Sequence, residues 1–169
     1  MKPRYTPTPG RLRRGFTLLE IMVSVTILGI LIAIAVPTYR HFQRRAENTT
    51  FVNNLRIFSQ AFETFAMKYG AWPPTATPTA GHGVVPFIDS NRTMSGEFRD
   101  VDWMAPTSVG GNWQWNFSSS SHPRAYISVV NVTATTSQMT EIDAILDDGI
   151  LTSGNFKGSG TTYTWVVQQ

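Results

Sequence analysis

The chain has 169 residues, enough for one membrane segment and one modest globular domain. It contains no cysteine, which excludes disulfides and thiol or iron–sulfur chemistry, while a hydrophobic content of 41% allows a packed core. Five of the 14 Lys and Arg residues precede Phe16, so the remainder carries nine basic and eleven acidic residues and a net charge of −2. This asymmetry is typical of a membrane-orientation signal, and we expect no strong nucleic-acid binding.

An apolar run of 21 residues, from Phe16 to Val36, follows the basic leader 1–15 and contains one acid, Glu20. As a helix the run would span about 31 Å, close to the thickness of one hydrocarbon core. The positive-inside rule keeps the leader in the cytoplasm and sends the C-terminal part outward. A carboxylate within such a segment is costly, which predicts a function for Glu20.

Two kinds of processing are compatible with this segment. Ordinary signal peptidase could cut after the small residues Ala33-Ile34-Ala35, but the apolar run exceeds the usual length of about 7–15 residues and Glu20 would have no purpose. A cut between Gly15 and Phe16 would instead leave a free amine one helical turn from Glu20. The helix dipole favours a carboxylate there, and Glu20 could pair with the amine of a neighbouring subunit. We favour the second cut; a secreted or simply anchored protein is the alternative.

The segment Gly15-Phe16-Thr17-Leu18-Leu19-Glu20-Ile21-Met22-Val23 resembles the N-terminal processing motif of type IV pilins and type II secretion pseudopilins. The resemblance implies that a membrane prepilin peptidase cuts after Gly15, that Phe16 becomes N-methylated, and that Glu20 acts in assembly. Gly29 and Pro37 match positions at which the helix of this family is weakened. The resemblance covers about the first third of the chain.

For the whole chain, this resemblance implies an α+β fold: a long N-terminal α-helical spine packed on a small antiparallel β-sheet. It also implies a precursor in the inner membrane, with its C-terminal domain outside the cytoplasm, that assembles into a homo-oligomeric filament with other pilin-like subunits. The expected partners are the prepilin peptidase and an assembly platform with its ATPase. A major pilin, a minor pilin that primes or tips a filament, and a secretion pseudopilin all fit, and no enzymatic activity is expected.

After Pro37 the apolar pattern becomes periodic, which predicts an amphipathic half-helix over 37–69. The stripe consists of aromatic and leucine side chains three or four residues apart: Phe51, Leu55, Phe58, Phe62, Phe65 and Tyr69, with Tyr39, Phe42 and Ala46 extending it upstream. We expect one helix from near Phe16 to about Lys68, weakened at Pro37 and at 48–50, and ended by Gly70 and by Pro73-Pro74.

The remaining residues, 70–111 and 112–169, are expected to form a long connecting loop and then the sheet, so that 37–169 make the globular domain. Strands are predicted over 112–117, 125–133 and 161–167, the first two joined by a turn at 118–123. The alternating Trp113, Trp115 and Phe117 favour a core face, with a ligand platform as the alternative.

Three acids near the C-terminal end, Asp143, Asp147 and Asp148, could supply oxygen ligands to Ca²⁺. Their spacing does not match an EF-hand, so the prediction is no metal and no other cofactor, and a short helical or extended segment that ends in an Asp-Gly turn. The three histidines, His41, His82 and His122, sit in unrelated contexts, and no phosphate-binding loop or catalytic cluster is recognisable.

Overall fold

The computed structural model describes residues 15–79, 81–118 and 124–168. The leader up to residue 14 and residues 119–123 of the predicted turn at 118–123, among them His122, lie outside them. The elements in chain order are α1 (Leu18–Tyr69), β1 (Phe87–Asp89), β2 (Arg92–Thr93), α2 (Asp100–Met104), β3 (Asn112–Ser118), β4 (Arg124–Val130), α3 (Thr136–Leu146), β5 (Phe156–Ser159) and β6 (Thr162–Gln168). The chain divides into two compact units, one ending at His41 and the other beginning at Phe42.

The first unit contributes only the N-terminal part of α1. Every side chain from Gly15 to His41 is exposed, and the helix is assigned without a break through Pro37. The expected weak points at Pro37 and 48–50 therefore do not end the helix. The predicted single helix from near Phe16 to about Lys68 is confirmed.

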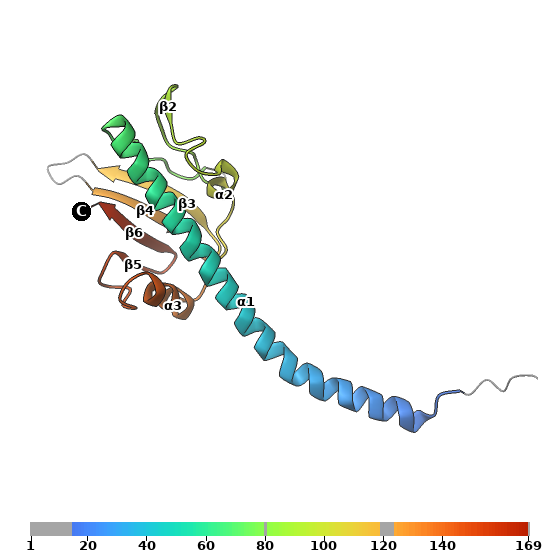
Figure 1. Ribbon diagram of the computed structural model, residues 1–169. Coiled ribbons are helices and arrows are strands. Elements are labelled where there is room, and N and C mark those ends of the chain that lie inside the picture. The colour runs from blue at the N-terminus through green and yellow to red at the C-terminus, as the bar shows by residue number, and fades with distance from the viewer. Residues whose placement is uncertain (1–14, 80, 119–123, 169) are drawn as a thin grey trace, which may run out of the picture. The chain divides into compact units, whose positions relative to one another are not determined.

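In the second unit, the part of α1 after Phe42 lies across one face of the β-sheet (Figure 1). The predicted stripe is buried from Phe51 to Phe65 and Tyr69 packs against its end. The upstream extension is wrong as a packing prediction, because Tyr39, Phe42 and Ala46 are exposed. Gly70 has a φ of 66° and donates its N–H to the Ala66 carbonyl, so it caps the helix as expected.

The sheet is antiparallel throughout, with the strand order β3-β4-β6-β5. Residues 112–117, 125–130 and 162–167 match the predicted strands, whereas the end of the second prediction is wrong. β4 stops at Val130 because Asn131 takes a positive φ of 60°. β5 was missed: it is only four residues long and exists through its pairing with β6.

Cross-strand register places the large side chains of the sheet on the face that α1 covers. Trp113 pairs with Val129 and Trp115 pairs with Ile127. Trp115 stacks on Phe62 with ring centroids 3.8 Å apart, and its Nε1 donates to the Pro73 carbonyl at 2.8 Å. Both tryptophans are fully buried, so the core interpretation is confirmed and these two side chains form no exposed ligand platform.

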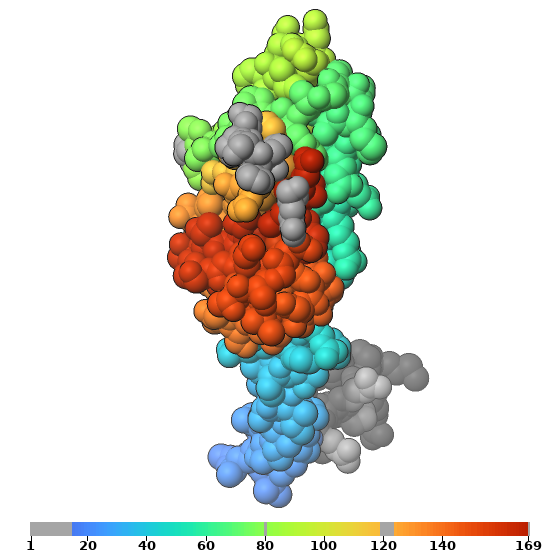
Figure 2. Space-filling model, turned by 90° about the vertical axis from the view of Figure 1, so that its left-hand side faces the viewer, coloured from blue at the N-terminus to red at the C-terminus, as the bar shows by residue number. Residues whose placement is uncertain are grey.

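The connection 70–111 carries more structure than expected. It contains the β1–β2 hairpin and α2, and its Trp103 is buried against Phe58 and Phe62. A bridge between Ala76 and Trp115 covers the outer edge of β3. Figure 2 shows the lime hairpin region at one end of this unit and the orange-red region of α3 and β5 at the other.

α3 begins with a capping pattern. The Thr135 hydroxyl accepts a hydrogen bond from the Gln138 N–H, and Thr135-Thr136-Ser137-Gln138 has the spacing of a capping box. Gln138 donates to Asn48 Oδ1 at 3.0 Å, and Asn48 donates to Glu141 at 3.1 Å. Arg44 of α1 also pairs with Glu141 at 2.9 Å. These contacts fix α3 beside α1.

Candidate functional site: the apolar helix start and an acidic cluster

The first candidate site is the start of α1. Its first turn is capped by Thr17, whose hydroxyl accepts a hydrogen bond from the Glu20 N–H at 3.2 Å. Thr17 and Glu20 have the spacing of a capping box, and the Thr17 carbonyl accepts the N–H of Ile21. The spacing of Thr17 and Glu20 is visible in the sequence, but the sequence analysis did not predict Thr17 as the helix cap. The cap fixes where the helix begins, two residues after Phe16.

Polar side chains inside the apolar run bond within the helix itself. Ser24 donates to the Glu20 carbonyl at 2.7 Å, and Thr26 donates to the Met22 carbonyl at 2.8 Å. These hydroxyls therefore need no water and no partner outside the helix, as an apolar environment requires. One stretch of α1, near the N-terminus, is long and apolar enough to cross a membrane, and none of it is buried within the chain.

The Glu20 carboxylate differs from these hydroxyls. Within residues 15–79, 81–118 and 124–168, no hydrogen bond or ion pair reaches it. Gly15 and Phe16 precede the helix and are exposed, and a side chain added at Gly29 would meet nothing within 4 Å. The start of α1 thus presents an apolar surface with one acid that has no partner inside the described chain.

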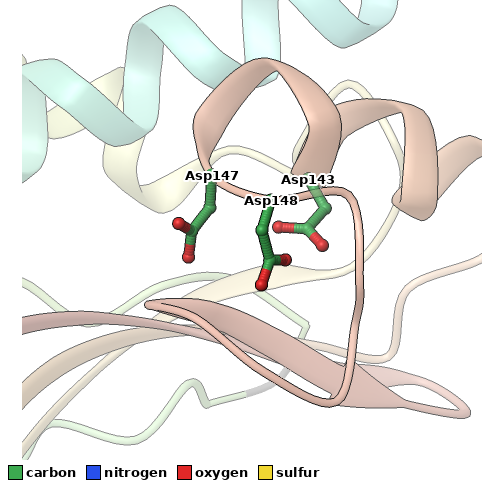
Figure 3. A group of neighbouring side chains, drawn as sticks. All are labelled: Asp143, Asp147 and Asp148. Atoms are coloured by element: carbon green, nitrogen blue, oxygen red, sulfur yellow. The ribbon is translucent and has the colours of Figure 1, made fainter.

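The second candidate site is the cluster of Asp143, Asp147 and Asp148, at the end of α3 (Figure 3). One carboxylate oxygen from each residue lies within 4.8 Å of the other two. All three side chains leave the end of α3 on the side that faces the following loop (Figure 3). The sequence predicted a helical or an extended form for this segment, and the structure shows the helical one. Asp147 is the C-cap residue, at which the chain leaves α3.

Two of these carboxylates organise the loop that leads to β5. Asp147 accepts the N–H groups of Asn155 and Phe156. Asp148 accepts the N–H of Ile150 at 2.8 Å and the hydroxyl of Ser153 at 2.7 Å. The hydrogen bond from Ser153, followed by that from Ile150, lowers the pKa of Asp148.

Asp143 has a different environment. Its side chain is 0% exposed and neither carboxylate oxygen has a hydrogen-bond partner. Burial raises the pKa of Asp143, and the neighbouring charges of Asp148 and Asp147 raise it further. The cluster therefore holds two carboxylates with polar contacts and one buried carboxyl group without any.

Residues 10–36 match the family model described as the prokaryotic N-terminal methylation motif. Similar curated proteins include a type IV major pilin of Neisseria gonorrhoeae, 33% identical over 66 residues that make up 39% of this chain and 40% of that protein. A fimbrial protein of Pseudomonas aeruginosa is 33% identical over 78 residues, which are 46% of this chain and 51% of that protein. The chain thus spans only about half the length, or less, of these curated relatives.

Among solved structures, the major type IV pilin PilA1 of Clostridium difficile is similar, with a TM-score of 0.51 and 13% identity. The match covers 75% of this chain and 97% of that one, and it shows the shared fold: a long N-terminal helix packed on an antiparallel sheet. The motif, the relatives and the fold together identify a type IV pilin-like protein.

Proposed function

We propose that this chain is a structural subunit of a type IV pilus or pilus-like filament, made as a membrane precursor, cut after Gly15 and methylated on Phe16. The observation that carries this proposal is the exposed apolar part of α1, which is joined to a well-packed α+β unit. Such a surface needs a bilayer before assembly and apolar surfaces of other subunits afterwards. The proposed role is structural and involves no catalysis.

In this proposal Glu20 sets the register between subunits. Its carboxylate has no partner within the described chain, whereas cleavage would create a free amine on Phe16 of each copy. Pairing the Glu20 carboxylate of one copy with the Phe16 amine of the next would remove two unpaired charges from an apolar assembly. Prepilin peptidase, an assembly platform and its ATPase are the partners that this route requires.

The precursor route is tested by N-terminal sequencing and intact mass of protein extracted from the membrane. A start at methylated Phe16 supports the proposal. A start at Val36 overturns it in favour of a secreted protein, and an intact Met1 overturns it in favour of a simple anchor.

The register role is tested by Glu20→Ala, with Glu63→Ala as the matched control because Glu63 is an exposed acid in the packed part of the same helix. We expect both variants to be cleaved normally and only Glu20→Ala to lose filaments recovered by shearing. A normal filament yield from Glu20→Ala contradicts the register role. Abundance in the sheared fraction also separates a major pilin from a minor pilin or pseudopilin.

A further inference from the structure

The part of α1 that directly follows the apolar run carries a group of basic side chains. Arg40, Arg44 and Arg45 lie within six residues, and no acid occurs between Glu20 and Glu47. Basic residues on the outer side of a membrane segment run against the positive-inside rule, which places them in the cytoplasm. The five basic residues of the leader outweigh these three and keep the expected orientation. The outer arginines therefore need an explanation of their own.

Two of the three arginines have no partner for their charge in the described chain. Arg44 donates to Glu141 at 2.9 Å and to the Ser137 hydroxyl at 3.1 Å, so α3 compensates it. The side chains of Arg40 and Arg45 are exposed, and no side-chain hydrogen bond or ion pair within the described residues reaches them. Arginine is always charged in proteins, and its planar set of donors matches a phosphate group.

Tyr39 and Phe42 supply a second and independent observation. Their spacing continues the packed stripe of α1, yet Tyr39 is 70% exposed and Phe42 is 61% exposed. Tyrosine is enriched where a membrane segment meets water, and an exposed Phe ring gains free energy when apolar groups cover it. At 3.6 residues per turn, these aromatic residues and the two arginines point to different sides of the helix. This distribution fits a helix that has lipid headgroups all around it.

We propose that Arg40 and Arg45 bind the phosphate groups of anionic phospholipids in the leaflet that faces away from the cytoplasm, with Tyr39 and Phe42 at the same level. The proposal rests on the membrane precursor proposed above. It would hold the subunit at one depth in the bilayer before assembly, and transfer into a filament would break these lipid contacts.

The helix geometry places both arginines near the headgroups. Arg40 lies about 6 Å beyond Val36 along the helix, and Arg45 lies about 14 Å beyond it. The headgroup layer of one leaflet is about 5–8 Å thick. A long helical side chain extends over the turn that precedes its own Cα, so Arg45 reaches back towards that layer by about 5 Å.

Acidic side chains of neighbouring copies are the competing partners for these arginines. They would explain the unpaired charges of Arg40 and Arg45 but not the exposed rings of Tyr39 and Phe42 beside them. A lipid surface accounts for both, because it offers phosphate groups and apolar cover at adjacent depths.

The test measures the lipid selectivity of the full chain with spin-labelled phospholipids. Protein extracted from the membrane is reconstituted in phosphatidylcholine with a trace of labelled phosphatidylglycerol or labelled phosphatidylcholine. Electron paramagnetic resonance then gives the fraction of each label that is slowed at the protein surface. Intact mass verifies the same N-terminus in every variant, so any leader contributes equally. We expect the wild-type chain to prefer phosphatidylglycerol, and 1 M NaCl to weaken that preference by screening.

A double variant, Arg40→Gln with Arg45→Gln, isolates the two arginines. A basic residue near an anionic surface gives about a fivefold preference at its own site. Averaged over the surrounding lipid shell, the double variant should lower the preference for phosphatidylglycerol by roughly twofold or more. Arg124→Gln, which removes an exposed arginine on β4, is the matched control and should leave the preference unchanged.

The outcomes distinguish this proposal from the proposed function. If neither label is slowed, α1 does not enter the bilayer and the membrane precursor fails as well. Slowed labels without a preference for phosphatidylglycerol overturn the lipid contact alone. A double variant that keeps the wild-type preference, or an equal fall in Arg124→Gln, also overturns it. Unchanged selectivity with lost filaments in the double variant would assign the arginines to acids of neighbouring copies.

Discussion

Replacement of Phe62 by Ala tests whether the aromatic stripe of α1 holds the packed unit together. Phe62 is 0% exposed and stacks on Trp115 at 3.8 Å with an interplanar angle of 5°, while its ring also meets Trp103 edge-on at 5.4 Å. Removing a buried Phe side chain lowers the free energy of unfolding by about 3–5 kcal/mol. The lost aromatic stacking accounts for about 0.5–1.5 kcal/mol of that decrease. We therefore expect Phe62→Ala to lower the free energy of unfolding by about 4 kcal/mol.

That loss is large against a total stability of about 5–15 kcal/mol. The assay is urea unfolding of the full chain in a non-ionic detergent, followed by near-ultraviolet circular dichroism, because this signal reports the packing of the buried aromatic side chains, Trp115 among them, rather than helix content. The matched control is Ile57→Ala on the same helix, where the side chain is 53% exposed and the expected change is within about 0.5 kcal/mol. A Phe62→Ala loss no larger than that of Ile57→Ala would refute the idea that the stripe carries the packing.

Three further outcomes are expected. Asn48→Ala should destabilise the chain by about 2–4 kcal/mol in urea, because it removes the bonds to Gln138 and Glu141; Asn53→Ala on an exposed face is the control, and equal effects would contradict the role of this contact. Gly154→Ala and Gly96→Ala should each lower the free energy of unfolding by about 1–2 kcal/mol, because both glycines have a positive φ. Gly154→Ala should exceed this cost, because its added Cβ would also meet the Asp147 carboxylate. The pKa of Asp89 should lie below its ordinary 3.8 in a carboxyl NMR titration, because hydrogen bonds from the Arg92 side chain and then the Asn91 N–H favour the charged form. The stabilisation from Asp89 is thus present above pH 3.8 and lost as the pH falls through the lowered pKa. An Arg92→Gln variant should raise the pKa of Asp89 towards the ordinary value without reaching it, because the Asn91 N–H still donates; an unchanged pKa in that variant would exclude the Arg92 side chain as the main cause.

Local pattern alone determined the long helix, its end and three of the strands. The 3.6-residue period of the apolar positions after Phe51 specifies which face of α1 is buried, and Gly70 supplies the left-handed residue that ends it. Period-two alternation placed Trp113 and Trp115 on one face of β3, because successive side chains of a strand point to opposite sides. The apolar run with one acid was equally visible, because it depends on composition and not on tertiary contacts.

Tertiary structure decided what the pattern could not. β5 forms only because β6 lies beside it, and the upstream stripe at Tyr39 and Phe42 is exposed although its spacing continues the buried one. The acidic cluster shows the same limit most clearly. The sequence singled out Asp143, Asp147 and Asp148 only as weak candidates for oxygen ligands near a turn, but packing of α3 buries Asp143 completely and leaves it without a donor. Burial and hydrogen-bond satisfaction are properties of the three-dimensional arrangement, since they depend on neighbours that are distant in the chain.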